Sequence, residues 1–255
     1  PIERTYDEWS KSVYAQAGIQ CQDCHMMPVE LAIETARTMK KQKNPGQPAI
    51  MGPQRDQMYT HEFVGGNAVV TDLLGAKKHA GIAVKRLQNA ASLSLELPEK
   101  AAPGELVRLK AVVRNETAGH NLPTSLTEVR QVWLEVKATV GGKTVYHNGG
   151  IDEKGKIDPE AAMFGAVAMD KDGHHTVKPW EIVRFESVTT IQPKGSAVVP
   201  YAFLLPADAA GPVDIAATLH YRTASQELAD FLLGEGAPTI PVIDMVSASG
   251  SIALP

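Results

Sequence analysis

The two cysteines of the chain lie three residues apart and are followed directly by a histidine, in the run Cys21-Gln22-Asp23-Cys24-His25. This spacing places both sulfurs on one side of a tight turn, where each can form a thioether bond to a vinyl group of haem. The histidine that follows can then bind the iron as an axial ligand. The sequence therefore predicts one covalently attached c-type haem on Cys21, Cys24 and His25.

Two other interpretations of the cysteine pair fit the sequence less well. A thioredoxin-like redox pair needs a strand before it in an α/β unit, whereas the residues before Cys21 have a helical pattern. A zinc site needs two more cysteine or histidine ligands at matching spacing, and the sequence has no second cysteine pair. Haem is the interpretation that uses all three residues of the motif.

Covalent haem also predicts where the protein works. Attachment of this type takes place on the outer side of the bacterial inner membrane, so we expect an exported protein of the periplasm or the cell surface. Free cysteines would risk oxidation to a disulfide there, but thioether bonds consume both sulfurs. The motif and the expected compartment are therefore consistent.

Composition and charge give no indication of a membrane-spanning helix or of a nucleic-acid partner. The chain has 255 residues with 44% hydrophobic and 21% charged residues, and no run of about eighteen apolar residues that could span a bilayer. The net charge is −4 with both signs spread along the sequence, which does not indicate a nucleic-acid partner. We expect redox partner proteins instead, including other cytochromes.

The sequence pattern changes near residue 91. Before this point helical and loop patterns predominate, with helices expected at 6–17, 29–41 and 67–90. After it, short alternating runs stand between turn signals, one of them Gly141-Gly142, and a short helix is expected at 225–233. The expected strands cover residues 92–97, 107–113, 131–137, 143–146, 182–189, 197–205, 213–222 and 246–254.

These patterns predict an α+β protein with two domains. Residues 1–90 are expected to form a mostly helical haem c domain. Residues 91–255 are expected to form an antiparallel, immunoglobulin-like β-sandwich. The stretch 152–175 is too long for a simple turn; its Asp170–Gly173 part loosely resembles a calcium loop but lacks a suitably placed closing glutamate.

The second axial ligand of the iron has three candidates. His61 is the first choice, because Gly65 and Gly66 follow it and would let the backbone approach a flat macrocycle. His120 is the second choice; it lies between two expected strands and would reach the haem only if the two parts of the chain pack there. Met58 is the third, since methionine also binds haem iron but is a common core residue as well. A histidine without such a context is usually a surface or core residue, and five remain in that group: His79, His147, His174, His175 and His220.

Several segments together resemble the carboxy-terminal portion of bacterial multihaem c-type cytochromes. Those proteins pass electrons in respiration or to extracellular acceptors, and the portion in question ends in a β-rich domain. The resemblance implies that the segments around His61 and His120 bind or pack against haem. The similar segments cover residues 6–12, 21–26, 61–66, 119–124 and 130–134.

The chain departs from that family pattern in two ways. It has one haem motif, so a row of closely spaced haems cannot lie within these residues. It also has Val13 and Tyr14 where relatives often place a histidine ligand for a neighbouring haem. The chain could therefore be a piece of a larger cytochrome, a subunit that docks beside other haem proteins, or a single-haem descendant with another task.

Three functions follow from these expectations. The first is electron transfer by a six-coordinate iron, in which case the protein is a carrier and no catalytic residue is predicted. The second is a haem-based sensor or binder of a small gas, which needs an open or displaceable distal position. The third is a haem enzyme, such as a peroxidase or a small-molecule reductase, which needs an open iron and nearby acid-base groups.

Overall fold

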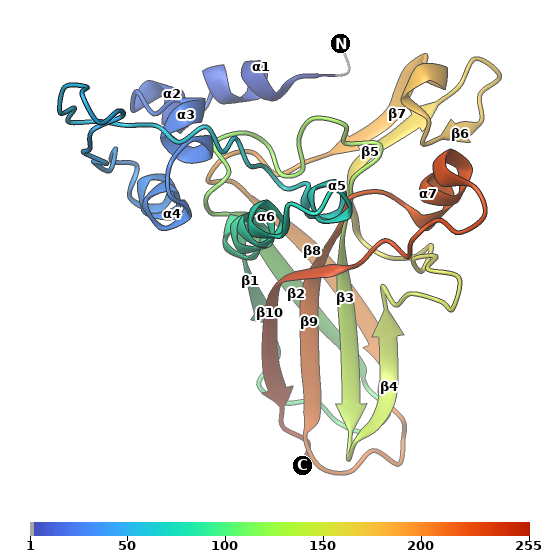
Figure 1. The fold of residues 1–255 in the computed structure, drawn as a ribbon. Coiled ribbons are helices and arrows are strands. Elements are labelled where there is room, and N and C mark those ends of the chain that lie inside the picture. The colour runs from blue at the N-terminus through green and yellow to red at the C-terminus, as the bar shows by residue number, and fades with distance from the viewer. Residues whose placement is uncertain (1–2) are drawn as a thin grey trace.

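The computed structural model describes residues 3–255. Helices occupy the first part of the chain and strands most of the remainder (Figure 1). Within the described residues no helix has both the length and the apolar character that crossing a membrane requires. The helices before the first strand are α1 (Thr5–Ser10), α2 (Val13–Gln16), α3 (Cys21–His25), α4 (Val29–Thr38), α5 (Ala68–Leu73) and α6 (Lys77–Ala90).

Two antiparallel sheets form the body of the molecule, and the helices lie across its upper end in Figure 1. The smaller sheet has the order β1 (Ala91–Glu96), β2 (Leu106–Asn115), β8 (Ser196–Leu204). The larger sheet has the order β10 (Ile243–Ile252), β9 (Val213–Arg222), β3 (Gln131–Val140), β5 (Met163–Met169), β6 (His175–Thr176), with β4 (Lys143–Asn148) paired to β3 and β7 (Arg184–Thr189) paired to β5.

Alternating apolar residues explain why the two sheets share a core. On β2, Val107 and Leu109 are buried while the residues between and after them are exposed, and β9 repeats the pattern with Val213 and Ile215. A period of two places such residues on one face of a strand. Each fully buried side chain of this kind contributes about 1.5–3 kcal/mol. The inward faces of both sheets therefore belong to one apolar core.

The prediction of a mostly helical haem domain was wrong, because strand residues outnumber helical ones and the first helices do not build a substantial core. Helix α1 has no buried residue, and the apolar cluster among the first helices contains only Tyr14, Ile19 and Ala36 as buried members. Helix α6 instead packs Ala83 and Leu87 into the core of the sheets. Sequence periodicity identified helices, but it did not show that the last of them joins the β core.

The single helix predicted at 67–90 is two helices. Asn67 caps α5 by accepting the Val70 N–H at 3.3 Å, and the chain then turns at Gly75. Gly75 has a φ of +78°, a left-handed conformation that glycine adopts without steric cost. The break turns the chain between α5 and α6, whose last residue leads directly into β1.

The eight strand runs predicted after residue 91 all overlap strands of the structure, and the helix predicted at 225–233 is α7 (Gln226–Leu233). The division into residues 1–90 and 91–255 stays a prediction. The unplaced stretch 152–175 contains β5 and the turn into β6, which project beside β7 at the upper right of Figure 1.

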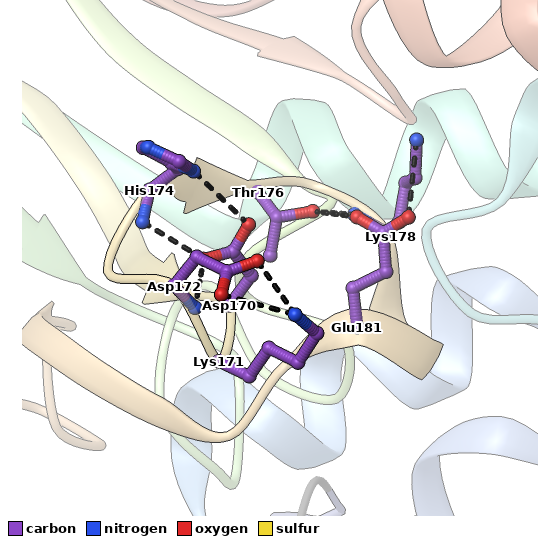
Figure 2. A network of polar contacts seen from close by, with 7 residues as sticks. All are labelled: Asp170, Lys171, Asp172, His174, Thr176, Lys178 and Glu181. Atoms are coloured by element: carbon purple, nitrogen blue, oxygen red, sulfur yellow. Dashed lines mark hydrogen bonds and ion pairs between the residues drawn. The ribbon is translucent and has the colours of Figure 1, made fainter.

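Figure 2 shows how polar contacts hold this projecting segment together. Asp170 Oδ1 accepts the N–H groups of Asp172 at 2.9 Å and His174 at 2.8 Å, and the 3-10 helix η1 (Pro179–Glu181) follows. Glu181 accepts the Thr176 hydroxyl at 2.9 Å. Asp170 Oδ1 thus accepts hydrogen bonds from the backbone of its own loop. Residues 3–255 contain no cluster of three or more His, Cys, Asp or Glu arranged to hold a metal ion.

Candidate functional site

The Cys-x-x-Cys-His run forms helix α3, and Asp23 anchors it. Asp23 is buried; its Oδ2 accepts the Gln20 N–H at 2.8 Å and lies 2.9 Å from Lys41 Nζ, while its Oδ1 accepts the Tyr59 hydroxyl at 2.7 Å. Burial by itself would raise the pKa of Asp23, but the hydrogen bonds from Gln20, Lys41 and Tyr59 outweigh it and lower the pKa. The ionised side chain therefore fixes the turn between the two cysteines.

Both cysteines face a cavity of about 600 Å³, a size typical of cofactor sites. Cys21 is exposed and Cys24 is partly buried. The opposite wall is formed by residues 117–125 of the loop between β2 and β3, and a third part of the wall comes from Phe63 and residues 65–67. The cavity thus lies between the first helices and the upper end of the sheets.

His25 is placed to offer one ring nitrogen to a metal. Its Nδ1 lies 2.8 Å from the backbone oxygen of Val64, which can only accept, so Nδ1 carries the hydrogen and Nε2 keeps its lone pair. Burial lowers the pKa of His25 to about 4, so the ring is neutral at physiological pH. Phe63 stacks beside the ring at 5.0 Å between centroids. A hydrogen bond of this kind is the usual way in which a protein orients a histidine ligand.

His120 has the same arrangement on the other wall. Its Nδ1 lies 2.9 Å from the backbone oxygen of Asn121, which again leaves the Nε2 lone pair available. Burial lowers the pKa of His120, so it too is neutral. Its ring centroid is 6.2 Å from that of His25 and the two planes are 16° apart. Two imidazoles that bind one metal ion from opposite sides through bonds of about 2 Å have centroids about 6 Å apart.

The structure does not bring His61 or Met58 to the cavity. His61 is exposed, and neither residue belongs to the cavity wall. The sulfur of Met58 packs so closely against Gly46 that a Cβ atom at position 46 would lie 2.7 Å from it. The backbone N–H of Met58 donates to the backbone oxygen of Asn44. The structure therefore gathers Cys21, Cys24, His25 and His120 at one place, and the first and third sequence candidates lie elsewhere.

Sequence reasoning missed Arg86 of helix α6. Its Nη2 donates to the backbone oxygen of Cys24 at 2.6 Å, and it lines the cavity. Its Nε is buried and has no hydrogen-bond partner within the described part of the chain. Burial lowers the pKa of Arg86, yet a guanidinium stays charged. One signal could have revealed it: Arg86 shares the helix face of Ala83 and Leu87, where an arginine interrupts an apolar stripe.

Tyr14 joins the two walls of the cavity. Its hydroxyl lies 2.8 Å from the backbone oxygen of Ala36 and 3.2 Å from that of Glu116, and its ring packs against Gly119. The side chain is almost completely buried. Tyr14 thus ties the first helices to the loop that carries His120.

Comparison with known structures shows the fold. The chain is similar to the penta-haem cytochrome c552 from Thermochromatium tepidum, with a TM-score of 0.59 and 20% sequence identity. The match covers 99% of this chain and 51% of that cytochrome, so the chain spans about half the length of that protein. At this identity the likeness shows a shared fold.

Other comparisons add nothing to the fold assignment. The CARDB domain of the PF1109 protein from Pyrococcus furiosus matches at 11% identity and a TM-score of 0.29, covering 65% of this chain and 87% of that one. The superoxide reductase from Ignicoccus hospitalis matches at 12% identity and a TM-score of 0.27, covering 66% and 86%. The amino-acid sequence matches no protein-family model and no curated protein at a significant level.

Proposed function

We propose that this chain is a c-type cytochrome that holds one covalent haem and transfers electrons. The observation that carries the proposal is the pair His25 and His120, which face each other across a cavity lined by both cysteines. Their separation and their free Nε2 atoms fit a metal between them. The cavity volume also suits a haem, and so does the charged Arg86 in the wall, whose Nε has no hydrogen-bond partner among the described residues. The iron and propionates of a haem are polar, while its macrocycle is apolar.

Each residue of the site has a separate task in this proposal. Cys21 and Cys24 would attach the haem, and His25 and His120 would bind its iron. The haem supplies one-electron redox chemistry when it is bound. The protein orients both imidazoles through Val64 and Asn121 and keeps them neutral by burial. The sequence ranking that placed His61 first stays a prediction, and the geometry favours His120.

Two histidine ligands favour electron transfer over the alternatives. A gas sensor or a haem enzyme needs a coordination position that is open or easily vacated. The ring of His120, in the loop between β2 and β3, lies 6.2 Å from that of His25, so His120 would occupy the second position on an iron held by His25. We therefore propose a carrier that exchanges electrons with redox proteins, other cytochromes among them, in the periplasm or at the cell surface.

The visible spectrum of the purified protein tests the proposal. We expect sharp low-spin bands in the oxidised and reduced forms, with no change on adding carbon monoxide to the reduced protein. A Cys24→Ala variant should then release haem, or a larger part of it, into acid acetone. A high-spin spectrum with ready carbon monoxide binding would instead support a sensor or an enzyme, and full haem retention in the variant would contradict thioether attachment.

A further inference from the structure

Asn121, the residue after His120, is fixed at three of its polar groups. Its backbone oxygen accepts the Nδ1–H of His120 at 2.9 Å, and its backbone N–H donates to Glu8 Oε2 at 3.1 Å. Its side-chain Nδ2 donates to the hydroxyl of Thr190 at 2.9 Å. The direction of the His120 ring therefore depends on where Asn121 is held.

Glu8 of helix α1 holds the same loop at a second point. The oxygen that accepts the Asn121 N–H also accepts the hydroxyl of Thr124 at 2.6 Å. Thr5, one turn earlier on α1, lies 2.9 Å from Thr124 Oγ1. Hydrogen bonds to an ionised carboxylate are shorter and stronger than bonds between neutral groups. One carboxylate oxygen thus ties residues 121 and 124 to α1.

The opposite side of the loop is held by the sheets. The buried Asn115, at the end of β2, donates its Nδ2 to the backbone oxygen of His120 at 2.9 Å. Leu122 pairs with Ile191 through two backbone hydrogen bonds, each 2.9 Å long. The loop is therefore clamped between the sheets and α1, and Glu8 is the carboxylate of α1 that bonds to residues 121 and 124.

We propose that Glu8 is a positioning residue for the distal ligand, which acts through Asn121 to keep His120 directed at the iron. The inference rests on the proposed haem site and adds the way in which that site stays closed to other ligands. Loss of Glu8 should let His120 leave the iron and admit a small ligand.

Three variants of the holoprotein test the role of Glu8. Glu8→Ala removes both loop contacts, Glu8→Gln keeps an accepting oxygen without the charge, and Asp7→Asn removes a neighbouring exposed charge on the same helix as the matched control. Carbon monoxide binding to the reduced protein, haem content and reduction potential are measured for each. We expect Glu8→Ala to increase the rate or extent of carbon monoxide binding by about tenfold or more, because the loop loses two hydrogen bonds to a charged group.

The conservative variant separates positioning from general loss of structure. Glu8→Gln should keep the low-spin spectrum, while its reduction potential rises because a negative charge that favours the ferric state is gone. Asp7→Asn should resemble the unchanged protein in carbon monoxide binding. If Glu8→Ala retains haem and resists carbon monoxide as the unchanged protein does, the inference is overturned.

A further variant covers the case in which Glu8→Ala loses haem or does not fold. Thr124→Val keeps the side-chain shape and removes the 2.6 Å bond to Glu8, so it should raise carbon monoxide binding in the same direction. No increase in Thr124→Val would then overturn the inference. If the protein without any substitution carries no covalent haem, the proposed function itself is refuted. If that protein holds haem but binds carbon monoxide readily, His120 does not block the iron, and the role of Glu8 is overturned.

Discussion

The imidazole rings of His25 and His120 lie 6.2 Å apart between centroids and 16° from parallel, although 94 residues separate them in the chain. His25 closes the short helix α3, whereas His120 lies in the loop between β2 and β3. Each donates its Nδ1–H to a backbone oxygen, of Val64 in one case and of Asn121 in the other. The two halves of the proposed iron site thus come from different parts of the fold and have the same local chemistry.

Replacing His120 by alanine should remove the distal ligand. We expect the low-spin spectrum to become high-spin and the reduced protein to bind carbon monoxide, with covalent haem retained. His61→Ala is the matched control, because His61 is exposed and lies outside the cavity wall. If His61→Ala changes the spectrum and His120→Ala does not, the ranking from sequence is right and the ligand assigned from the geometry is wrong.

Arg86 should raise the reduction potential of the iron. Arg86 is partly buried and lines the cavity, and a positive charge there favours the ferrous state. We expect Arg86→Gln to lower the midpoint potential by an amount on the order of tens of millivolts. Lys85→Gln removes the same charge from the exposed side of α6, where Lys85 pairs with Glu30, and should shift the potential much less. Equal shifts in a spectroelectrochemical titration would argue against a special role for Arg86.

Glu128 should make stability depend on pH. Burial raises the pKa of Glu128, and both carboxyl oxygens lack a hydrogen-bond partner within residues 3–255. Below the pKa of the unfolded chain both states are protonated and the native state carries no penalty. As pH rises above that value the unfolded state ionises first, so the free energy of unfolding falls until pH passes the higher native pKa.

The Glu128→Gln variant tests this dependence. Urea unfolding between pH 4 and pH 8 should show a stability advantage for the variant at neutral pH that disappears in acid. The exposed Glu99→Gln is the control and should show no such advantage. A variant less stable than the unchanged protein at pH 7 would mean that Glu128 is bound by a favourable partner when ionised.

The proposed boundary near residue 91 can be examined with two fragments. Residues 91–255 contain the ten strands of the described part of the chain and most of the apolar core, so we expect a cooperative β fold. It should be less stable than residues 77–255, because α6 supplies Leu87 to that core and losing a buried leucine costs roughly 2–5 kcal/mol. Circular dichroism and thermal unfolding of both fragments provide the measurement. An unfolded 91–255 fragment would count against a separate domain.

The features that depend on neighbouring residues were visible in the sequence. The spacing of Cys21, Cys24 and His25 fits within one short helix, and the alternation on β2 and β9 follows from the geometry of a strand. The sequence favours His61 as the second axial ligand because Gly65 and Gly66 follow it, but these glycines indicate only that the backbone is free to bend there. That signal could not show which histidine would lie opposite His25.

Tertiary packing decided the remainder. Helix α6 joins the core of the sheets through Ala83 and Leu87, so the helical haem domain that periodicity suggested does not exist. His120 reaches the cavity because Asn115, Asn121 and Glu8 clamp its loop from two sides. The sequence by itself determined the close spacing of Cys21, Cys24 and His25 and which segments form strands, since both depend on contacts within a few residues. The fold determined that His120 faces His25, because the loop that carries His120 is held by hydrogen bonds to Glu8, more than a hundred positions away.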